Sequence, residues 1–163
     1  MQFEMTKLDS FMYVGNKDID DDHTKLLEII GKLSDREATK DKQYTLGVCA
    51  ELARYVDYHF RREEVIMEKL KYPDLERHKK LHKEFEEKAH SYIDRMHKNW
   101  QTWYAGSLYV LLLEWLVRHI IDEDLRCSAW AREGKFPPLR KRRPINEVLK
   151  DIEPLTKKYK LIK

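Results

Sequence analysis

The chain has 163 residues and a formal net charge of +3; 37% of its residues are charged, and only five are glycine and five are proline. This composition is typical of one helical domain with a solvated surface. A chain of this length can bury a hydrophobic core without the cross-links that very small domains need. No apolar run reaches the roughly 18 residues of a membrane span, so no span is expected. The first ten residues lack a signal-peptide pattern. Two cysteines make no disulfide framework and fit a reducing compartment, so we expect a cytoplasmic protein.

Four long segments carry the hydrophobic period of an amphipathic helix. The first has acidic cap candidates at residues 19–22, and the second should stop at Tyr72-Pro73, because a residue before proline disfavours the helical region. Asp74 can cap the third. The four segments are expected at about 20–38, 42–70, 74–98 and 106–130. Short connections make neighbouring helices antiparallel, so the expected fold class is all-α: an up-down-up-down four-helix bundle with an N-terminal arm and a C-terminal helical extension.

The end of the chain differs from the rest in charge. Residues 135–163 hold ten Lys/Arg and three Asp/Glu, a balance of +7, which leaves −4 for the preceding residues. We expect a bundle over 1–131 and a basic extension over 132–163, in which Pro144 opens a short helix to about Asp151. The basic run lacks the interleaved aromatic residues of a nucleic-acid module, so no nucleic-acid partner is expected. The extension could cover a bundle end, mediate homo-oligomerisation or dock a protein partner.

Five of the seven histidines fall on the apolar faces of the predicted helices. They are His23, His59, His78, His82 and His119. Residues four apart lie about 40° apart around a helix, so Glu63 faces the same way as His59, and His78 the same way as His82. One buried imidazole is usually a satisfied core residue, but five would each need a partner for a polar nitrogen. A metal centre supplies such partners. The other two, His90 and His97, are expected on the surface.

The number of candidate ligands indicates more than one metal ion. A single zinc ion is saturated by four ligands, whereas five histidines and at least one carboxylate exceed that number. Two metal ions that share a carboxylate fit better. Imidazole with carboxylate suits iron, and also tolerates manganese or zinc, so the residue types leave the element open.

Three stretches of the chain contain, in order, the spacings H, HxxxE, HxxxH and HxxxxD. They are IDDDHTKL (19–26), HFRREEVIMEKLKYPDLERHKKLHKEF (59–85) and EWLVRHIIDED (114–124). Over about residues 8–126 the chain thereby resembles the hemerythrin family, and within it the bacterial hemerythrins. The resemblance implies a four-helix bundle around a non-haem diiron site that binds O2 reversibly, with two iron ions bridged by carboxylates and an oxo or hydroxo group.

The resemblance also implies a ligand set. It consists of His23, His59, Glu63, His78, His82, His119 and Asp124. Glu63 and Asp124 would bridge the ions; three histidines would saturate one iron, and His23 and His59 would leave a position open on the other. Helix geometry alone does not select Asp124, because five residues are about 140° around the helix from His119. Glu123 or Asp122 would be simpler, so Asp124 requires a widened turn such as a π-bulge.

The family pattern further implies an apolar lining for the O2 pocket. Its residues would be Leu26, Phe60, Trp115 and Leu116, although plain core residues would show the same spacing. Three positions depart from the pattern: Leu8 replaces a usual Trp, Asn16 an apolar residue and Asp22 a usual Gln. They concern the N-terminal arm, which would then pack differently or admit solvent.

The resemblance favours a non-enzymatic protein that binds O2, and small anions such as azide, for storage, delivery or sensing. The alternative is an enzyme on the same site, peroxidase-like or nitric-oxide-consuming. An iron store is disfavoured, because one site holds too little metal.

Overall fold

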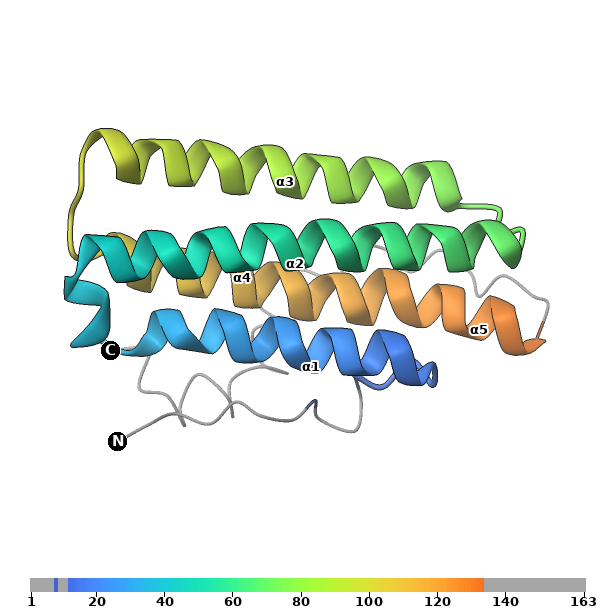
Figure 1. Cartoon of the computed structure of the whole chain (residues 1–163). Coiled ribbons are helices and arrows are strands. Elements are labelled where there is room, and N and C mark those ends of the chain that lie inside the picture. Colours follow the sequence, from blue (N-terminus) through green and yellow to red (C-terminus); the bar gives the residue numbers. More distant parts are fainter. Residues whose placement is uncertain (1–7, 9–11, 134–163) are drawn as a thin grey trace.

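The computed structural model describes residue 8 and residues 12–133. Four helical rods lie side by side with alternating direction (Figure 1). They are α1 (Lys17–Gly31), α2 (Lys42–Lys69), α3 (Leu75–Lys98) and α4 (Tyr104–His119), the last continuing through the π-helical turn η4 (Ile120–Asp124) into α5 (Leu125–Glu133). No strand occurs among the described residues. The predicted all-α four-helix bundle is confirmed, whereas the expected C-terminal extension and its helix after Pro144 lie outside the described residues.

The first helix begins earlier than predicted because Asn16 caps it. The Asn16 side-chain oxygen accepts hydrogen bonds from the backbone N–H groups of Asp18 (3.0 Å) and Ile19 (3.3 Å), as N-cap residues do. Asp20, predicted as a cap candidate, has another role. Its carboxylate accepts from the backbone N–H groups of Val14 (2.8 Å) and Gly15 (3.2 Å) and so fastens the N-terminal arm to α1.

The first helix also ends earlier than predicted, at Gly31 rather than near residue 38. Two short 3-10 turns follow, η2 (Lys32–Ser34) and η3 (Ala38–Lys40). Between them, the carboxylate of Asp35 accepts from the backbone N–H groups of Glu37 and Ala38, each at 3.0 Å. Aspartate often binds the backbone two or three residues ahead in this way, which favours a turn over a helix.

The second and third helices match their predicted ranges to within one residue. Asp41 caps α2 by accepting from the backbone N–H of Gln43 at 2.7 Å. The reversal after α2 passes through Lys71, whose φ of 50° lies in the left-handed region, so the helix stops just before the predicted Tyr72-Pro73. The predicted cap Asp74 makes no side-chain capping bond. Its carboxylate instead lies 3.2 Å from Arg126 Nη1 on α5.

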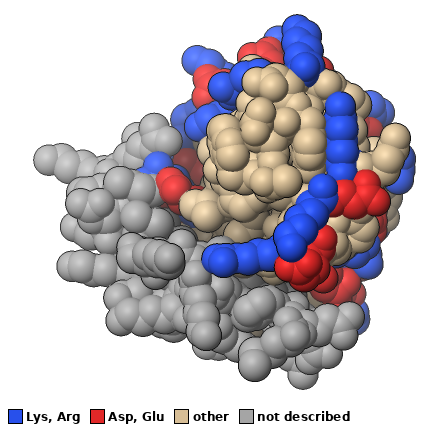
Figure 2. Space-filling view, turned by 90° about the vertical axis from the view of Figure 1, so that its left-hand side faces the viewer, with Lys and Arg blue, Asp and Glu red and all other residues tan. Residues whose placement is uncertain are grey.

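The bundle interior changes character along its length. At the end that carries the α1–α2 and α3–α4 connections, the buried side chains are mostly apolar, including Leu33, Met96, Leu108 and Leu113. Figure 2 looks onto this end, where uncharged side chains gather in the middle of the described face, with charged ones mainly along its top and right-hand side. In the other half, histidines and carboxylates take the buried positions.

The last rod is long and apolar enough to pass a length-and-hydropathy test for a membrane span, over Tyr104–Glu133. Half of the tested window is buried inside the bundle. A core helix passes the same test, so the result does not show a membrane span.

Candidate metal centre

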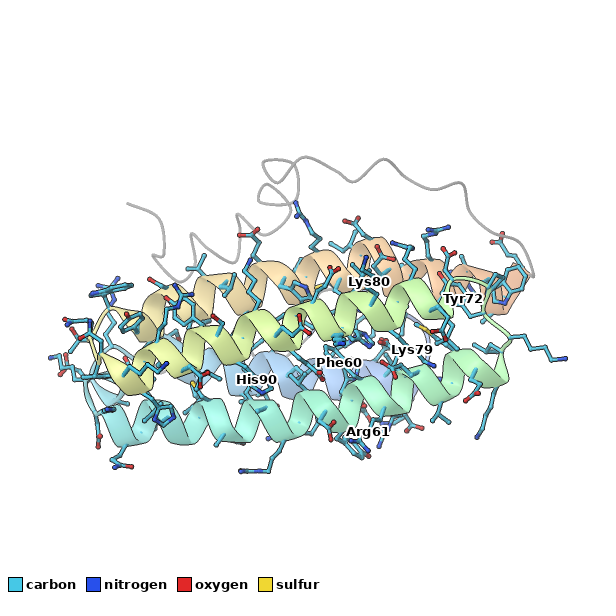
Figure 3. The ribbon with its side chains drawn as sticks, turned by 90° about the horizontal axis from the view of Figure 1, so that it is seen from above. Phe60, Arg61, Tyr72, Lys79, Lys80 and His90 are labelled. Atoms are coloured by element: carbon cyan, nitrogen blue, oxygen red, sulfur yellow. The ribbon has the colours of Figure 1, made fainter. Side chains whose placement is uncertain are left out.

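All seven predicted ligands converge in the half of the bundle near the α2–α3 connection. Each has at most 4% of its surface exposed. They are contributed by four rods: His23 by α1, His59 and Glu63 by α2, His78 and His82 by α3, and His119 and Asp124 by α4 and η4. Figure 3 shows the neighbouring Phe60 inside the bundle between α2 and α3, while Arg61 lies on the outer side of α2.

Three histidines and a glutamate form the first part of the cluster. His119 Nε2 lies 3.2 Å from His78 Nε2 and 3.1 Å from His82 Nε2. Glu63 Oε2 lies 3.0 Å from His78 Nε2 and 3.1 Å from His82 Nε2. Four donor atoms from three helices therefore face one point.

Two histidines form the second part, and Glu63 belongs to both. One donor atom each from His23, His59 and Glu63 lies within 4.8 Å of the others. His23 Nε2 is 3.3 Å from one oxygen of Asp124, while His119 Nε2 is 3.2 Å from the other. Each carboxylate is thus placed between a three-histidine and a two-histidine group.

The donor set fits metal ions better than it fits a closed hydrogen-bond network. Neutral imidazoles carry one N–H each. If Nδ1 of His82 donates to Glu64, its Nε2 offers only a lone pair to His119 Nε2 and to the Glu63 carboxylate, each 3.1 Å away. Among the described residues, Nδ1 of His23 and Nδ1 of His78 have no hydrogen-bond partner, although buried polar atoms usually do. Two nitrogens bound at right angles by bonds of about 2.1 Å would lie about 3.0 Å apart, close to the separations found here.

The π-helical turn explains how Asp124 reaches the cluster. A π turn holds one more residue than an α turn, and η4 spans Ile120–Asp124, directly after His119. The turn brings the residue five positions after His119 onto the same side. Glu123, the simpler choice on helix geometry, instead pairs with Arg77, whose Nη1 donates to its Oε1 at 3.1 Å and whose Nη2 donates to its Oε2.

Two further carboxylates orient ligand histidines from behind. His82 Nδ1 lies 2.8 Å from Glu64 Oε1, and His59 Nδ1 lies 3.4 Å from Asp22 Oδ2. Tyr55 donates its hydroxyl to the other oxygen of Asp22 at 2.9 Å. Such partners fix the ring so that Nε2 faces the metal. Sequence reasoning missed Glu64 because its spacing from His82 depends on how α2 and α3 are rotated against each other.

The protonation states of the cluster also favour metal ions. Burial would raise the pKa of Glu63 and of Asp124, but the surrounding histidines hold both pKa values below their usual ranges. Burial lowers the pKa of His119 to about 4. These three groups therefore lack a proton near neutral pH, which is the form that binds metal. Burial also opposes protonation of His23 and His78, yet Asp124 and Glu63 raise their pKa values.

Aromatic rings form one wall of the cluster. Phe60 stacks on His82 with ring centroids 3.6 Å apart and an interplanar angle of 2°, and Trp115 stacks on His119 at 4.5 Å and 14°. Leu26 and Leu116 are buried, at 2% and 3% exposure, and each lies three residues along its helix from a ligand histidine. Phe60 and Trp115 thus contact ligand histidines, whereas Leu26, Phe60 and Leu116 belong to the hydrophobic core and Trp115 packs against it. Their role as the lining of an O2 pocket stays a prediction.

Comparison with known proteins agrees with this arrangement. The sequence model of a family described as "Hemerythrin HHE cation binding domain" matches residues 14–130. The chain belongs to the hemerythrin family. A bacteriohemerythrin of Pseudomonas aeruginosa (strain LESB58) is 32% identical over 65% of this chain and 68% of its own length. That of Clostridium acetobutylicum is 30% identical over 68% and 89%, and a myohemerythrin of Theromyzon tessulatum is 29% identical over 66% and 78%.

As a hemerythrin, the chain departs from the family pattern at two positions before α1, Leu8 and Asn16, and at Asp22 within α1, and each of these residues has identifiable contacts. Leu8 is buried at 5% exposure and joins the main hydrophobic core. Asn16 caps α1, and Asp22 contacts His59 and Tyr55, as described above. The family and the His/carboxylate cluster together support a non-haem iron protein that binds O2.

Proposed function

We propose that this hemerythrin holds two iron ions per chain through the seven clustered residues and binds O2 reversibly. The observation that carries the proposal is the division of the cluster into a three-histidine and a two-histidine group that share Glu63. When bound, the iron pair supplies the redox chemistry that holds O2. Glu63 and Asp124 would each contact both ions, because each lies between the two groups.

The unequal numbers of histidines leave the two-histidine side with fewer protein ligands. His23 and His59 are the only histidines of that group among the described residues. A small ligand such as O2 or azide would take the remaining position there. Asp22 holds the His59 ring in place from behind, and the Phe60 ring lies beside it, with ring centroids 5.7 Å apart. Leu26, Phe60, Trp115 and Leu116 would together exclude water from the cluster. Such a site suits oxygen storage, delivery or sensing rather than turnover of a substrate.

The test is an absorption spectrum of iron(II)-loaded protein before and after exposure to O2. We expect a nearly colourless deoxygenated protein to become coloured in O2 and to lose the colour when O2 is removed. Azide should compete for the position and give a distinct band in the oxidised protein. Immediate irreversible oxidation, with no reversible phase on a stopped-flow timescale, would contradict reversible binding and favour an enzyme.

A matched pair of variants tests the apolar wall. Leu116→Asn should admit water and shorten the lifetime of the oxygenated form, with iron content unchanged. Val110→Asn makes the same kind of change on the same helix, at a side chain that is 42% exposed, and should leave the lifetime as in the wild type. Equal lifetimes in all three proteins would show that Leu116 has no role in excluding water.

A further inference from the structure

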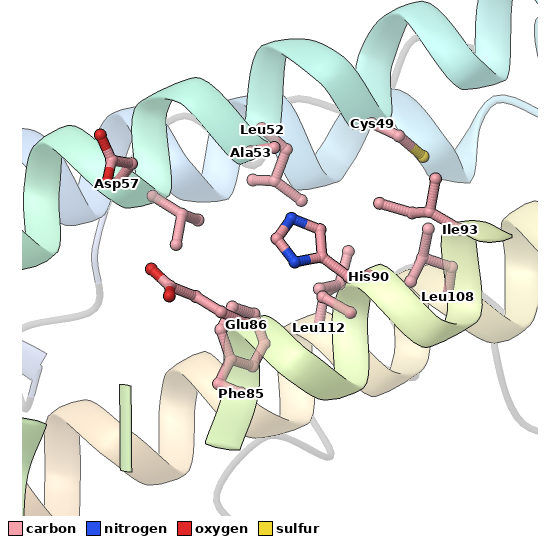
Figure 4. A pocket seen from close by; sticks show the side chains of 12 residues that line it. Cys49, Leu52, Ala53, Asp57, Phe85, Glu86, His90, Ile93, Leu108 and Leu112 are labelled. Carbon is pink, nitrogen blue, oxygen red and sulfur yellow. The ribbon is translucent and has the colours of Figure 1, made fainter. Parts of the chain in front are cut away.

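A cavity of about 170 Å³ lies between α2 and α3, with α4 as its floor (Figure 4), and none of the seven predicted ligands lines it. Its inner surface is apolar and includes Leu52, Val56, Leu108 and Leu112. Figure 4 shows Asp57 and Glu86 facing each other from α2 and α3, with the His90 ring directed from α3 toward α2. Asp57 and His90 are exposed, so the cavity has a polar mouth and an apolar interior.

The cavity ends on the aromatic wall of the metal centre. Phe85 lines it, and the Phe85 ring stacks on Trp115 at 3.9 Å and meets Phe60 edge-on at 6.0 Å. Val56 and Leu112 in the cavity lie one helical turn before Phe60 and Leu116 of the wall. A layer of aromatic side chains therefore separates this apolar space from the histidine cluster.

Two other cavities approach the cluster, and their chemistry differs. One, of about 310 Å³ between α3 and α4, reaches His119 but is lined by charged side chains such as Arg77, Lys88 and Glu114. The other, of about 260 Å³ beside α5, is mostly apolar and ends on Glu63 and Asp124. Only the α2–α3 cavity, among these three, combines an apolar interior with an end at Phe85, against Phe60 and Trp115.

We propose that the α2–α3 cavity is an antechamber that takes up a small neutral gas molecule, O2, and passes it between Phe60 and Phe85 to the metal centre. The inference deepens the proposed function and rests on it. An apolar cavity in a protein stays dry and binds apolar gases such as xenon, whereas ions and water favour the polar lining near His119. Phe60 and Phe85 form the gate, because their rings meet edge-on between the cavity and the cluster and rotation of these rings would open a passage.

Xenon and a matched pair of alanine variants test the antechamber. Ala53 is half-buried and lines the cavity, and Ala50 lies exposed nearly one turn earlier on the same helix. Iron-loaded, deoxygenated protein should bind xenon in this cavity, as seen in a xenon-pressurised crystal or by 129Xe NMR. Ala53→Phe should abolish that binding by filling the space, and Ala50→Phe should retain it.

Oxygen kinetics supply the second readout. A blocked passage raises the free-energy barrier for O2 entry and exit, but it changes neither the free nor the bound state of O2. Ala53→Phe should therefore slow O2 association and dissociation by the same factor, on the order of tenfold, with Kd and iron content unchanged. A merely structural effect would change Kd or iron content instead. Ala50→Phe should match the wild type.

The outcomes separate this inference from the proposed function. Unchanged O2 rates in Ala53→Phe, or slowing by Ala131→Phe in the cavity beside α5 instead, would overturn the antechamber and leave reversible O2 binding in place. Absence of xenon from the wild-type cavity would also overturn it. If xenon binds and Ala53→Phe abolishes it, but no reversible O2 uptake occurs, the gas-binding cavity stands and the proposed function fails.

Discussion

The two halves of the bundle use the same helices to bury opposite kinds of side chain. In the half near the α3–α4 connection, Met96, Ala105 and Tyr109 are at most 1% exposed, and their burial itself stabilises the fold. In the half near the α2–α3 connection, equivalent inward positions hold five imidazoles and two carboxylates. Burying such groups costs free energy unless they are paired or bind metal.

The difference indicates that apolar packing stabilises one half of the bundle, while the other half depends on metal binding. The apolar half contains the contacts that align the four rods without metal. The polar half brings together like donor atoms, such as the three Nε2 atoms of His78, His82 and His119. We therefore expect iron to stabilise mainly the polar half, and the following experiments test that contrast.

The largest effect is expected from His78→Ala. The wild type should bind two iron ions per chain, and removal of one donor from the three-histidine group should reduce iron content to one or less, because the remaining donors lose their geometry. Elemental analysis against protein concentration measures this. His90→Ala, at an exposed histidine on the same helix, should retain both ions. A wild-type stoichiometry of one, or full loading of His78→Ala, would contradict a dinuclear site.

A neighbouring pair in the π turn gives the next contrast. Asp124→Ala should disrupt the metal centre, because this buried carboxylate contacts histidines of both groups. Glu123→Ala removes an ion pair with Arg77 at the edge of the bundle and should leave iron content nearly unchanged, because Glu123 is not one of the clustered donors. Iron content and the absorption spectrum of the oxidised proteins report the difference. The reverse order would mean that ordinary helical spacing governs ligation.

A substitution in the apolar half should behave differently from both. Met96 has no measurable exposure, so Met96→Ala should lower the free energy of unfolding by about 2–5 kcal/mol. Iron content should remain at two, because the site lies in the other half. Denaturant titrations of iron-loaded and iron-free protein should give the same loss, since distant sites are additive. A loss that depends on iron would show that the two halves are coupled.

The last contrast concerns pH. Asp124 and Glu63 raise the pKa values of His23 and His78 above the ordinary value of 6.5, despite the opposing effect of burial. Iron must displace these protons, so the affinity of iron-free protein for Fe(II) should rise with pH through and above that value, by roughly tenfold per pH unit for each proton released. His119, with a pKa of about 4, adds no proton there. An affinity independent of pH between 6 and 8 would contradict this assignment.

Sequence periodicity predicted the rods and their inward faces well, because the apolar and histidine positions follow one helical repeat. It failed where a local side chain decides the boundary. Residues after Gly31 keep a helical pattern, but Asp35 binds the backbone and starts a turn. Leu70 is the last residue of the predicted segment 42–70, yet it is 38% exposed, because α2 ends at Lys69.

The residues of the candidate site also fall into those that helical spacing predicts and those that it does not. Spacings within one helix pair His59 with Glu63 and His78 with His82, and the structure brings these residues together. Asp124 could not be chosen by helical spacing, since its position depends on η4. Glu64 and Asp22 support histidines on other helices, and such contacts depend on the mutual rotation of two rods. The metal-ligand set itself remains a prediction.

The π turn has a consequence beyond the placement of Asp124. One extra residue in a helix rotates everything after it by about 100° relative to an uninterrupted α-helix. In α5 this rotation directs Cys127 inward and lets Ser128 donate its hydroxyl to the carbonyl oxygen of Val14 in the N-terminal arm. Replacement of a residue between 120 and 124 changes one side chain, whereas insertion or deletion there shifts the phase of the whole terminal segment. A change in the length of this segment should therefore disturb the chain after it more than a substitution between 120 and 123 does.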